Sequence, residues 1–510
     1  RQPGRVVLAD QTGGIKTYRD IITAILALKP EIEKLSGDYV GIMLPASAGA
    51  ATIYFATLFA GKIPVMVNWT VGSRNIVHSL DLLGVRHVLT AGALAQKIES
   101  QRTILGQLKD RFVMLEEVGQ RITTGQKLKA ALMSRLSWRA LARVKGKDTA
   151  VVLFTSGSES RPKAVPLTHT NILSNIRDFM KVFHFQPRDR LLGMLPPFHS
   201  FGLTVTICFP LCVSVRTVYH PNPTEGGTLA RMIAAYKVSL LVSTPTFLNG
   251  ILRGASDQQL QSLRAVISGA EKCPTQLYET VARRLPHLVL LEGYGITECS
   301  PAVSFNDEKA PRPQTIGKVV PSVQYALVDL ESGRRVAPGQ VGMLLVRGPG
   351  IFNGYLNYDG ASPFVEFEGK PWYRTGDLIS EDADGVLTFA GRLKRFVKLG
   401  GEMISLPAIE EVLARFYVGL DDEGPVIAVE STPVETNPEL VLFTVKDLDR
   451  EKVNQQIRAA GLSALYNIRS VVKLDEIPTL GTGKTNYHAL KEMLKAGQIG
   501  VTPSFPCRPE

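Results

Sequence analysis

Short apolar runs alternate with helix-compatible stretches up to about residue 300 of the chain. Parallel strands need a long crossover between them, and an α-helix usually forms that crossover. The alternation therefore predicts an α/β fold with parallel layers, in which helices cover the faces of the sheets. The runs that we expect to form buried strands span residues 40–44, 65–67, 151–154, 191–194, 240–243, 265–268 and 288–292.

The character of the sequence changes near Gln324, where short strand-like runs separated by turn signals replace the alternation. A chain of 510 residues is too long for one compact core, so we expect more than one domain. We predict a large domain over residues 1–393, with a β-rich subdomain over about residues 324–393, and then a small mobile α+β domain over residues 394–510. The helices expected in the small domain span residues 404–417 and 447–460.

Composition is that of an ordinary soluble protein, with 45% hydrophobic and 21% charged residues. The five cysteines have no metal-binding or disulfide-framework spacing, which favours a reducing, cytoplasmic location. Residues 39–61 are uncharged and long enough to span a membrane. They contain Pro45 and Gly49, however, which favour a buried strand over residues 39–44 and a helix over residues 50–60. Because the chain begins at Arg1 rather than methionine, we interpret it as part of a longer protein.

The net charge of +11 favours an acidic partner or an anionic surface. Residues 121–147 hold eight basic and no acidic side chains. Two interpretations stay open, a solvated basic helix packed on the domain and contact with an anionic membrane surface. No aromatic-basic reader motif accompanies the charge, so nucleic-acid binding is not expected. On a helical wheel one face carries Met133, Leu136, Ala140, Leu141 and Val144, and a flank carries Arg135, Arg139 and Arg143.

The loop after residues 151–154 is built to hold a polyphosphate. It reads Thr-Ser-Gly-Ser-Glu-Ser-Arg-Pro-Lys over residues 155–163, rich in hydroxyls and closed by lysine. A glycine lets the backbone approach phosphates, hydroxyls and amides donate hydrogen bonds, and the lysine offsets charge. An ordinary surface loop is the alternative. The residues that we single out are Thr155, Ser156, Gly157, Ser158 and Lys163.

A second polar motif, residues 293–298, follows the apolar run at residues 288–291. Tyr294 is suited to stack on a base, Thr297 to donate to a phosphate, and Glu298 to hold a hard cation such as Mg²⁺ through a carboxylate oxygen. A strand-to-loop turn with a surface glutamate is the competing interpretation. Asp377 and Arg392 follow at later turns, and an ionised carboxylate and a guanidinium fork suit ribose and phosphate oxygens.

These motifs occur in a fixed order, ending with residues 478–484, and the series resembles the adenylate-forming enzymes. That superfamily contains acyl-CoA and acyl-carrier-protein synthetases, luciferases and peptide-synthetase adenylation domains. The resemblance extends from about Asp10 to Lys491. In the loop, Glu159 replaces the usual threonine, and Ser160 and Ala164 replace glycines. The pattern is most similar to the acyl-[acyl-carrier-protein] synthetase domain of bacterial bifunctional 2-acylglycerophosphoethanolamine acyltransferases.

The resemblance implies a two-step ligase that uses ATP and Mg²⁺. A fatty carboxylate attacks the α-phosphate to give an acyl-adenylate, and a phosphopantetheine thiol then displaces AMP to give a thioester. It implies that Lys484 bridges the carboxylate and the α-phosphate, that Glu298 and Thr155 serve the metal, and that Lys394 is the hinge. Thr297 and His199 are the other implied catalytic residues, with His199 near the carboxylate end of an acyl pocket. The implied nucleotide-binding residues are Thr155, Ser156, Gly157, Ser158, Lys163, Gly269, Ala270, Glu271, Tyr294, Gly295, Thr297, Asp377, Arg392 and Lys484.

The acceptor of the acyl group is expected to be acyl carrier protein, whose acidic surface would complement the basic residues 121–147. Coenzyme A is an alternative, because both acceptors end in the same pantetheine arm. A non-catalytic relative that binds AMP or an acyl ligand is a further alternative. Peripheral attachment to the inner face of the cell membrane is an alternative for the location.

Overall fold

The computed structural model describes residues 2–100, 106–155, 162–399, 402–419, 422, 424–434, 438–480 and 484–496. The chain divides into two compact units. The larger unit comprises Arg1–Thr375 and Ile379–Phe389, and the smaller unit comprises Gly376–Leu378 and Ala390–Glu510.

The first sheet of the larger unit has the strand order β6-β5-β3-β4-β7-β8. All neighbours in it are parallel except β7 and β8, which form an antiparallel pair. The parallel part confirms the α/β prediction. The strands are β3 (Tyr39–Met43), β4 (Ile63–Met66), β5 (Val88–Thr90), β6 (Phe112–Met114), β7 (Thr149–Phe154) and β8 (Ala164–Thr168).

The second sheet has the order β15-β14-β13-β12-β11-β9-β10-β1-β2. Its centre is parallel, and antiparallel strands close both edges. The expected strands at residues 191–194, 240–243, 265–268 and 288–292 all lie in this parallel centre, with small shifts of their ends. The strands are β1 (Val6–Asp10), β2 (Gly14–Thr17), β9 (Arg190–Gly193), β10 (Arg216–Tyr219), β11 (Leu240–Ser243), β12 (Ala265–Ser268), β13 (Val289–Gly295), β14 (Ala302–Phe305) and β15 (Lys318–Val319).

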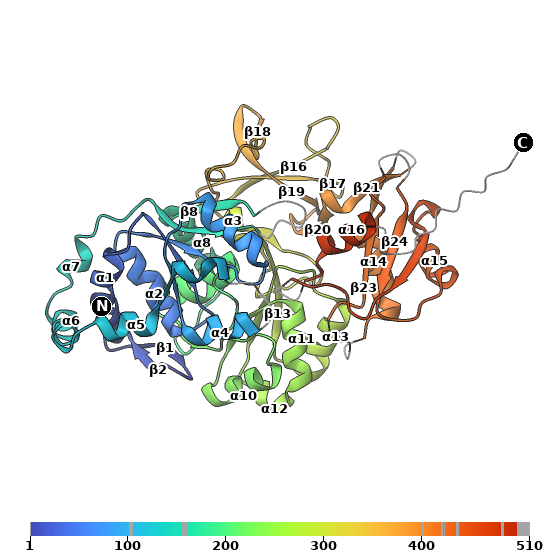
Figure 1. Cartoon of the computed structure of the whole chain (residues 1–510). Coiled ribbons are helices and arrows are strands. Elements are labelled where there is room, and N and C mark those ends of the chain that lie inside the picture. The colour runs from blue at the N-terminus through green and yellow to red at the C-terminus, as the bar shows by residue number, and fades with distance from the viewer. Residues whose placement is uncertain are drawn as a thin grey trace, which may run out of the picture. The chain divides into compact units, whose positions relative to one another are not determined.

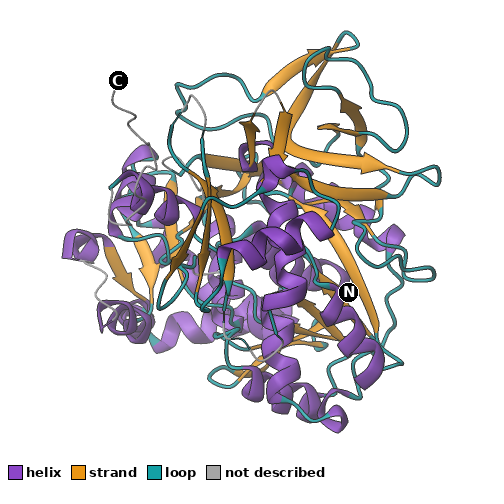
Figure 2. Ribbon diagram, turned by 90° about the vertical axis from the view of Figure 1, so that its right-hand side faces the viewer, coloured by secondary structure: helices purple, strands orange, loops and turns teal. Residues whose placement is uncertain are grey.

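Helices connect the parallel strands and pack on the two sheets (Figures 1 and 2). Residues 39–61 form strand β3 and helix α2, as the sequence predicted. Among the residues described, no helix combines the length and the hydropathy needed to cross a lipid bilayer. The helices are α1 (Tyr18–Glu33), α2 (Ala48–Phe59), α3 (Ser73–Leu82), α4 (Gly92–Ser100), α5 (Leu115–Arg121), α6 (Thr124–Leu136), α7 (Arg139–Ala142), α8 (His169–Val182), α9 (Phe209–Val213), α10 (Gly226–Tyr236), α11 (Pro245–Gly254), α12 (Asp257–Leu260) and α13 (Thr275–Arg284), with the short segments η1 (Gly106–Arg111), η2 (Gly202–Cys208) and η3 (Thr297–Cys299).

The basic stretch at residues 121–147 does not form the continuous amphipathic helix that the wheel assumed. The helix stops at Leu136, because Ser137 adopts an extended backbone, and α7 begins at Arg139. The indole Nε1 of Trp138 donates to the carbonyl of Ser134 at 2.8 Å and so satisfies an open carbonyl in the last turn of α6. Leu136, which the wheel placed on the packed face, is 72% exposed.

An antiparallel sheet begins at Gln324, where the sequence changed character. Its order is β16-β17-β19-β18, and β20 pairs with β19. Figure 1 shows these strands as a group without covering helices of their own. The strands are β16 (Gln324–Val328), β17 (Val341–Arg347), β18 (Phe364–Phe367), β19 (Lys370–Glu381) and β20 (Leu387–Arg392).

The smaller unit is α+β, with a two-stranded and a three-stranded sheet. Both helices expected from the sequence are present, but each begins later than predicted. Ser405 and Asp449 accept hydrogen bonds from the first turns of α14 and α15, and these caps set the starts. The elements are η4 (Leu393–Arg395), β21 (Phe396–Leu399), β22 (Glu402–Ser405), α14 (Leu406–Tyr417), β23 (Ile427–Ser431), β24 (Leu440–Thr444), α15 (Arg450–Ala459), η5 (Ala464–Tyr466), β25 (Ser470–Lys473) and α16 (Tyr487–Lys495).

Candidate active site

The motifs of the larger unit follow the carboxyl ends of its strands. Thr155 comes directly after β7, Gly269 after β12, and Thr297 shortly after β13. In α/β sheets this edge is the usual place for ligands, because the loops there can vary while the strands hold them in position. The topology thus gives the polar residues of all three motifs the position typical of a ligand site.

The two ends of the candidate phosphate loop are tied together. The backbone N–H of Thr155 donates to the carbonyl of Lys163 at 3.1 Å, and the N–H of Lys163 donates to Oγ1 of Thr155 at 3.4 Å. These bonds extend the β7–β8 pair by one step and fix where the loop leaves the sheet. Ser156, Gly157 and Ser158 lie outside the described residues.

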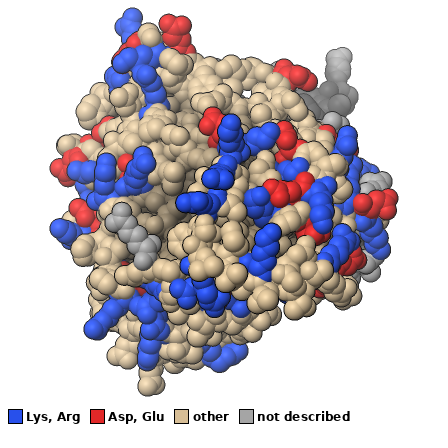
Figure 3. All heavy atoms as spheres, turned by 90° about the vertical axis from the view of Figure 1, so that its left-hand side faces the viewer, with Lys and Arg blue, Asp and Glu red and all other residues tan. Residues whose placement is uncertain are grey.

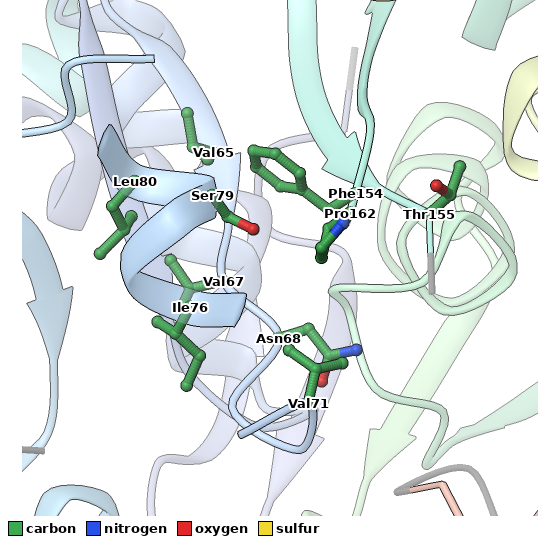
Figure 4. Close-up of a pocket in the computed structure, with 10 residues that line it drawn as sticks. All are labelled: Val65, Val67, Asn68, Val71, Ile76, Ser79, Leu80, Phe154, Thr155 and Pro162. Carbon is green, nitrogen blue, oxygen red and sulfur yellow. The ribbon is translucent and has the colours of Figure 1, made fainter. Parts of the chain in front are cut away.

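A small pocket lies beside the start of this loop (Figure 4). Thr155 stands at its edge, apart from the aliphatic group around Ile76. The pocket is lined mainly by aliphatic side chains, which can support the loop by packing but cannot stabilise the charge of a nucleotide. We therefore assign the pocket to packing beneath the loop. It is lined by Val65, Val67, Asn68, Val71, Ile76, Ser79, Leu80, Phe154, Thr155 and Pro162.

Glu298 is buried and held by a tyrosine that the sequence analysis did not single out. Its side chain is in η3, and the hydroxyl of Tyr355 donates to its Oε1 at 2.7 Å. Burial first, and then the Glu298 carboxylate, raises the pKa of Tyr355 above its ordinary value. The same two causes raise the pKa of Tyr373, which is hydrogen-bonded to Tyr355. Both phenols therefore stay protonated at neutral pH, and Tyr355 acts as a permanent donor to the carboxylate.

Lys163 lies on the other side of the same tyrosine. Its Nζ sits 4.8 Å from the ring centre of Tyr355 and 4.4 Å from that of Tyr358. Both distances are within the range of cation–π attraction. Tyr355 thus contacts the lysine of the phosphate loop with its ring and the carboxylate of Glu298 with its hydroxyl. This contact brings together two motifs that are 135 residues apart in the chain, one next to each sheet.

The glycines that follow β12 and line β13 sit in tight surroundings. A Cβ on Gly269 would lie 3.4 Å from the ring of Phe201 and 3.3 Å from the carbonyl of Gly293. A Cβ on Gly295 would meet the carbonyl oxygen of Pro301 at 2.2 Å, so that position requires glycine. Ala270, exposed between these motifs, adopts a left-handed φ of 72°. At these two glycines the backbone therefore packs closely against neighbouring backbone and ring atoms.

The structure also places three other predicted residues of this region, and two of them have partners. Tyr294 is buried, and its ring lies 5.9 Å from that of Phe389. Glu271 accepts a hydrogen bond from Oγ1 of Thr246 at 2.7 Å. Thr297 opens η3 and is half-buried, one residue before Glu298.

His199 is half-buried in an aromatic setting. Its ring lies 4.7 Å from that of Phe198, which in turn contacts Trp69 at 4.6 Å. The backbone N–H of His199 donates to Pro196 at 3.1 Å, within the turn that leads to η2. These contacts fix the start of the segment expected to support an acyl pocket.

An apolar cavity of about 280 Å³ lies at the far end of that segment. Its walls come from α2, α8, the η2–α9 segment and the residues that follow α7. None of the lining residues that the structure describes is a lysine, arginine, aspartate or glutamate, so the cavity suits hydrocarbon. The lining residues are Tyr54, Phe55, Leu58, Phe59, Val144, Gly146, Ala150, His169, Ile172, Leu173, Ile176, Cys208 and Cys212.

Asp377 and Arg392 belong to the smaller unit and form an ion pair. Nε of Arg392 lies 3.2 Å from Oδ1 of Asp377, and Asp377 is almost wholly buried while Arg392 is exposed. The two residues lie on the paired strands β19 and β20, and Gly376 and Gly391 next to them have positive φ. The sequence placed both residues at a nucleotide, and the structure adds that they contact each other.

Lys484 lies in a turn of the smaller unit, where its carbonyl accepts from Leu480 at 2.7 Å and residues 479 and 485 form a bridge. Lys394 is exposed in η4. The next residue, Arg395, is anchored inside this unit, with Glu410 at 2.8 Å and the ring of Tyr487 at 3.5 Å. Burial lowers the pKa of Arg395, but Glu410 and Glu430 outweigh it, so the net effect raises that pKa.

Residues 1–356 match the family described as AMP-binding enzyme. The chain belongs to this family. Among curated AMP-binding relatives, it is 28% identical over 501 residues to a long-chain-fatty-acid–CoA ligase of Yersinia pestis, covering 90% of this chain and 86% of that one. It is 27% identical over 474 residues to 4-coumarate–CoA ligase-like 6 of Arabidopsis thaliana, covering 90% and 81%.

The fold of this AMP-binding enzyme matches solved structures over almost its whole length. It superposes on ATP-bound MatB from Rhodopseudomonas palustris with a TM-score of 0.80 at 23% identity, covering 97% of this chain and 96% of that chain. It superposes on o-succinylbenzoate CoA synthetase (MenE) from Bacillus subtilis, determined with ATP and a magnesium ion, with a TM-score of 0.79 at 19% identity and 97% coverage of both chains. The adenylate-forming superfamily and the α/β fold class predicted from the motifs are confirmed.

Tyr355 gives the first testable prediction. Tyr355→Phe keeps the ring over Lys163 but leaves the buried Glu298 carboxylate without its donor, which should lower the free energy of unfolding by about 1–3 kcal/mol. Tyr358→Phe is the matched control, since it keeps the ring and, among the residues that the structure describes, the Tyr358 hydroxyl makes no hydrogen bond; it should change stability by less than about 0.5 kcal/mol. Urea unfolding followed by tryptophan fluorescence measures both. Equal effects of the two variants would contradict the role given to the Tyr355 hydroxyl.

Proposed function

We propose that this AMP-binding enzyme is an ATP-dependent acid–thiol ligase that activates a fatty acid. The carboxylate attacks the α-phosphate of ATP, pyrophosphate leaves, and the acyl-adenylate forms. A pantetheine thiol then attacks the acyl carbon and AMP leaves as the thioester forms. The observation that carries the proposal is the contact chain from Lys163 through Tyr355 to Glu298, which joins a phosphate-loop cation to a buried carboxylate.

The phosphate end of ATP binds between Thr155 and Lys163, where the loop hydroxyls donate and the lysine offsets charge. Within the described ranges, no cluster of three or more His, Cys, Asp or Glu has the arrangement of a metal site. One carboxylate with one hydroxyl fits Mg²⁺, which binds through one or two carboxylates, substrate phosphates and water. Glu298 and Thr155 would hold it, and the bound ion would supply positive charge next to the phosphates.

The adenosine end of ATP binds at the remaining motifs. Gly269, Ala270 and Glu271 let adenine approach the end of β12, with Tyr294 and Gly295 beside them and Thr297 directed to phosphate. Asp377 accepts from the ribose hydroxyls, and Arg392, already paired with it, supplies donors to ribose or phosphate oxygens. Lys484 bridges the attacking carboxylate and the α-phosphate.

A fatty acid is the proposed acid substrate. The relatives named as long-chain-fatty-acid–CoA ligases support it, and so does the apolar cavity whose walls include Cys208 and Cys212 from the segment after His199. Acyl carrier protein is our proposed acceptor, because it is acidic and this chain carries a net charge of +11. Coenzyme A is the second candidate, since the relatives quoted above are named as CoA ligases.

The function is tested with ATP, a ladder of fatty acids and either acceptor. We expect AMP release that depends on a long-chain acid and on the pantetheine acceptor, with acyl carrier protein preferred at low salt. Preference for coenzyme A at every salt concentration would overturn the acceptor assignment. Absence of fatty-acid-dependent pyrophosphate exchange, with nucleotide still bound, would make the protein a non-catalytic AMP-binding relative.

The proposed role of Lys484 gives a second prediction about the same reaction. Lys484→Ala should slow adenylation by about 10²–10³, or roughly 3–4 kcal/mol of barrier, because a cation at the developing charge is lost. Thioester formation from preformed acyl-adenylate should be largely spared. Lys473→Ala is the control in the same unit, since this exposed lysine pairs with the exposed Asp447 and, among the described residues, forms no other ion pair. Near-normal adenylation in Lys484→Ala would refute the role.

Lys394 is proposed as the hinge that lets one active site run both steps. Lys394→Pro fixes φ and should trap one arrangement of the segment, whereas Lys394→Ala keeps the backbone free. The anchored Arg395 holds the start of β21, so a change of φ at residue 394 would be passed on to the part of the smaller unit that follows it. We expect pyrophosphate exchange to survive in the proline variant and thioester formation to fall at least about tenfold. Equal loss of both steps in a folded protein would argue against a hinge here.

A further inference from the structure

Helix α6 turns its largest apolar side chains toward solvent. Leu128, Leu132 and Leu136 are 71%, 55% and 72% exposed. Residues four apart share one face of a helix, so the three leucines form a single row. The opposite face is packed through small residues. Ala130 and Ser134 are buried, and Oγ of Ser134 accepts from Oγ1 of Thr23 on α1 at 2.8 Å.

The helix that carries this row is firmly terminated at both ends. At its start Thr123 and Gln126 form a reciprocal capping box. At its end the Trp138 indole donates to the carbonyl of Ser134, and Trp138, two residues after Leu136, is 41% exposed. The outward direction of the leucines is therefore a property of a well-formed helix and not of a loose segment.

Basic side chains surround the leucine row. Residues 121–147 contain no acidic residue, and all eight of their lysines and arginines are exposed. Arg121 pairs with Glu117 and Lys147 with Asp38. Across the described part of the chain, none of the other six forms an ion pair, so their charge is available to an anionic partner: Lys127, Lys129, Arg135, Arg139, Arg143 and Lys145. Figure 3 shows the face to which α6 and α7 belong, with basic side chains, and acidic ones among them, scattered over a largely uncharged surface.

We propose that α6 and α7 dock this protein on an anionic phospholipid bilayer. The leucine row and Trp138 enter the boundary between head groups and acyl chains, while the flanking lysines and arginines reach the phosphates. Helices that lie in a membrane interface combine these two features, an apolar face with leucine and tryptophan and a strongly basic remainder. Long basic side chains extend along the helix so that the charge stays in the head-group layer.

An acidic carrier protein fits this surface less well. Complementary charge would attract it, but attraction of that kind needs no protruding apolar row. If the partner were recognised by charge alone, the three exposed leucines of α6 would remain in contact with water after it had bound. A bilayer accounts for the leucines, the tryptophan and the arginines together.

Docking would also bring a hydrocarbon site to the membrane. Val144 and Gly146, which follow α7 directly, line the apolar cavity of about 280 Å³. A fatty acid dissolved in the bilayer would then have a short path into the protein. This consequence rests on the proposed function, whereas the docking itself does not.

The apolar contribution is measured by flotation with phosphatidylcholine vesicles, with or without an equimolar share of phosphatidylglycerol. Wild type should bind the anionic vesicles, and its tryptophan emission should shift to the blue, because Trp138 is exposed, whereas Trp69 is half-buried and Trp372 is buried. The shift should be absent from a Trp138→Phe variant. Leu128→Gln, Leu132→Gln and Leu136→Gln together should lower partitioning at least about tenfold. The control Leu330→Gln with Val341→Gln, at residues 46% and 50% exposed elsewhere on the larger unit, should leave it unchanged. Unchanged binding of the α6 variant would overturn the proposal.

The charged contribution has its own matched pair of variants. Arg135→Glu, Arg139→Glu and Arg143→Glu together should weaken binding to anionic vesicles by about tenfold or more. Arg283→Glu, Lys309→Glu and Lys318→Glu change net charge equally at other exposed sites and should have a much smaller effect. Equal loss in both sets would show attraction by overall charge and overturn the assignment to α6 and α7.

An activity assay without membranes distinguishes a failure of the docking proposal from a failure of the proposed function. Pyrophosphate exchange with a short, water-soluble fatty acid should be unchanged in every α6 and α7 variant, which also shows that the variants are folded. If exchange is absent from the wild type but the vesicle results hold, the proposed function fails and the docking surface stands. If the arginine variant raises the KM for carrier protein while vesicle binding is unaffected, the surface serves a protein and the membrane proposal is wrong.

Discussion

The hydrogen bond from Tyr355 to Glu298, with Lys163 over the same ring, joins the parts of the larger unit on which nucleotide chemistry depends. Lys163 directly precedes β8, an edge strand of one sheet, and Glu298 follows the last parallel strand of the other. A buried carboxylate without a donor is costly, so the bond constrains the loop that carries Tyr355 as well as η3. Cation, carboxylate and phenol therefore hold one another in position before any ligand arrives.

The other polar residues of the candidate site are positioned by the strands that precede them. Polar residues at the carboxyl ends of β7, β12 and β13 share one kind of location, where rigid strands hold short loops. The backbone is also tightly packed at the end of β13, since Gly295 has no room for a side chain. The smaller unit has its own anchor, in which Glu410 and Glu430 bind Arg395 directly after the exposed Lys394. An anchored Arg395 directly after an exposed Lys394 is a suitable arrangement for a hinge.

The larger unit has two apolar features whose residues belong to none of its polar motifs. The cavity near Cys208 is lined mostly by apolar side chains, and the leucine row of α6 is open to solvent. Both are suited to hydrocarbon, and residues directly after α7 line the cavity. The eight basic residues at positions 121–147 concentrate much of the chain's net charge of +11 in one short stretch. Positive charge and exposed apolar side chains therefore occur together in this stretch.

The sequence by itself determined the fold class, the buried strands and the order of the nucleotide motifs. Alternating apolar runs and short loops of glycine and hydroxyl residues are local properties, and they can be read from neighbouring positions. Only the tertiary structure decided that Tyr355 contacts Lys163 and Glu298, that Arg392 pairs with Asp377, and that the leucines of α6 face outward. A helical wheel shows which residues share a face, but the packing of α6 on α1 decides which face is buried. Contacts between residues far apart in the chain depend on how the elements pack, and no local pattern encodes that packing.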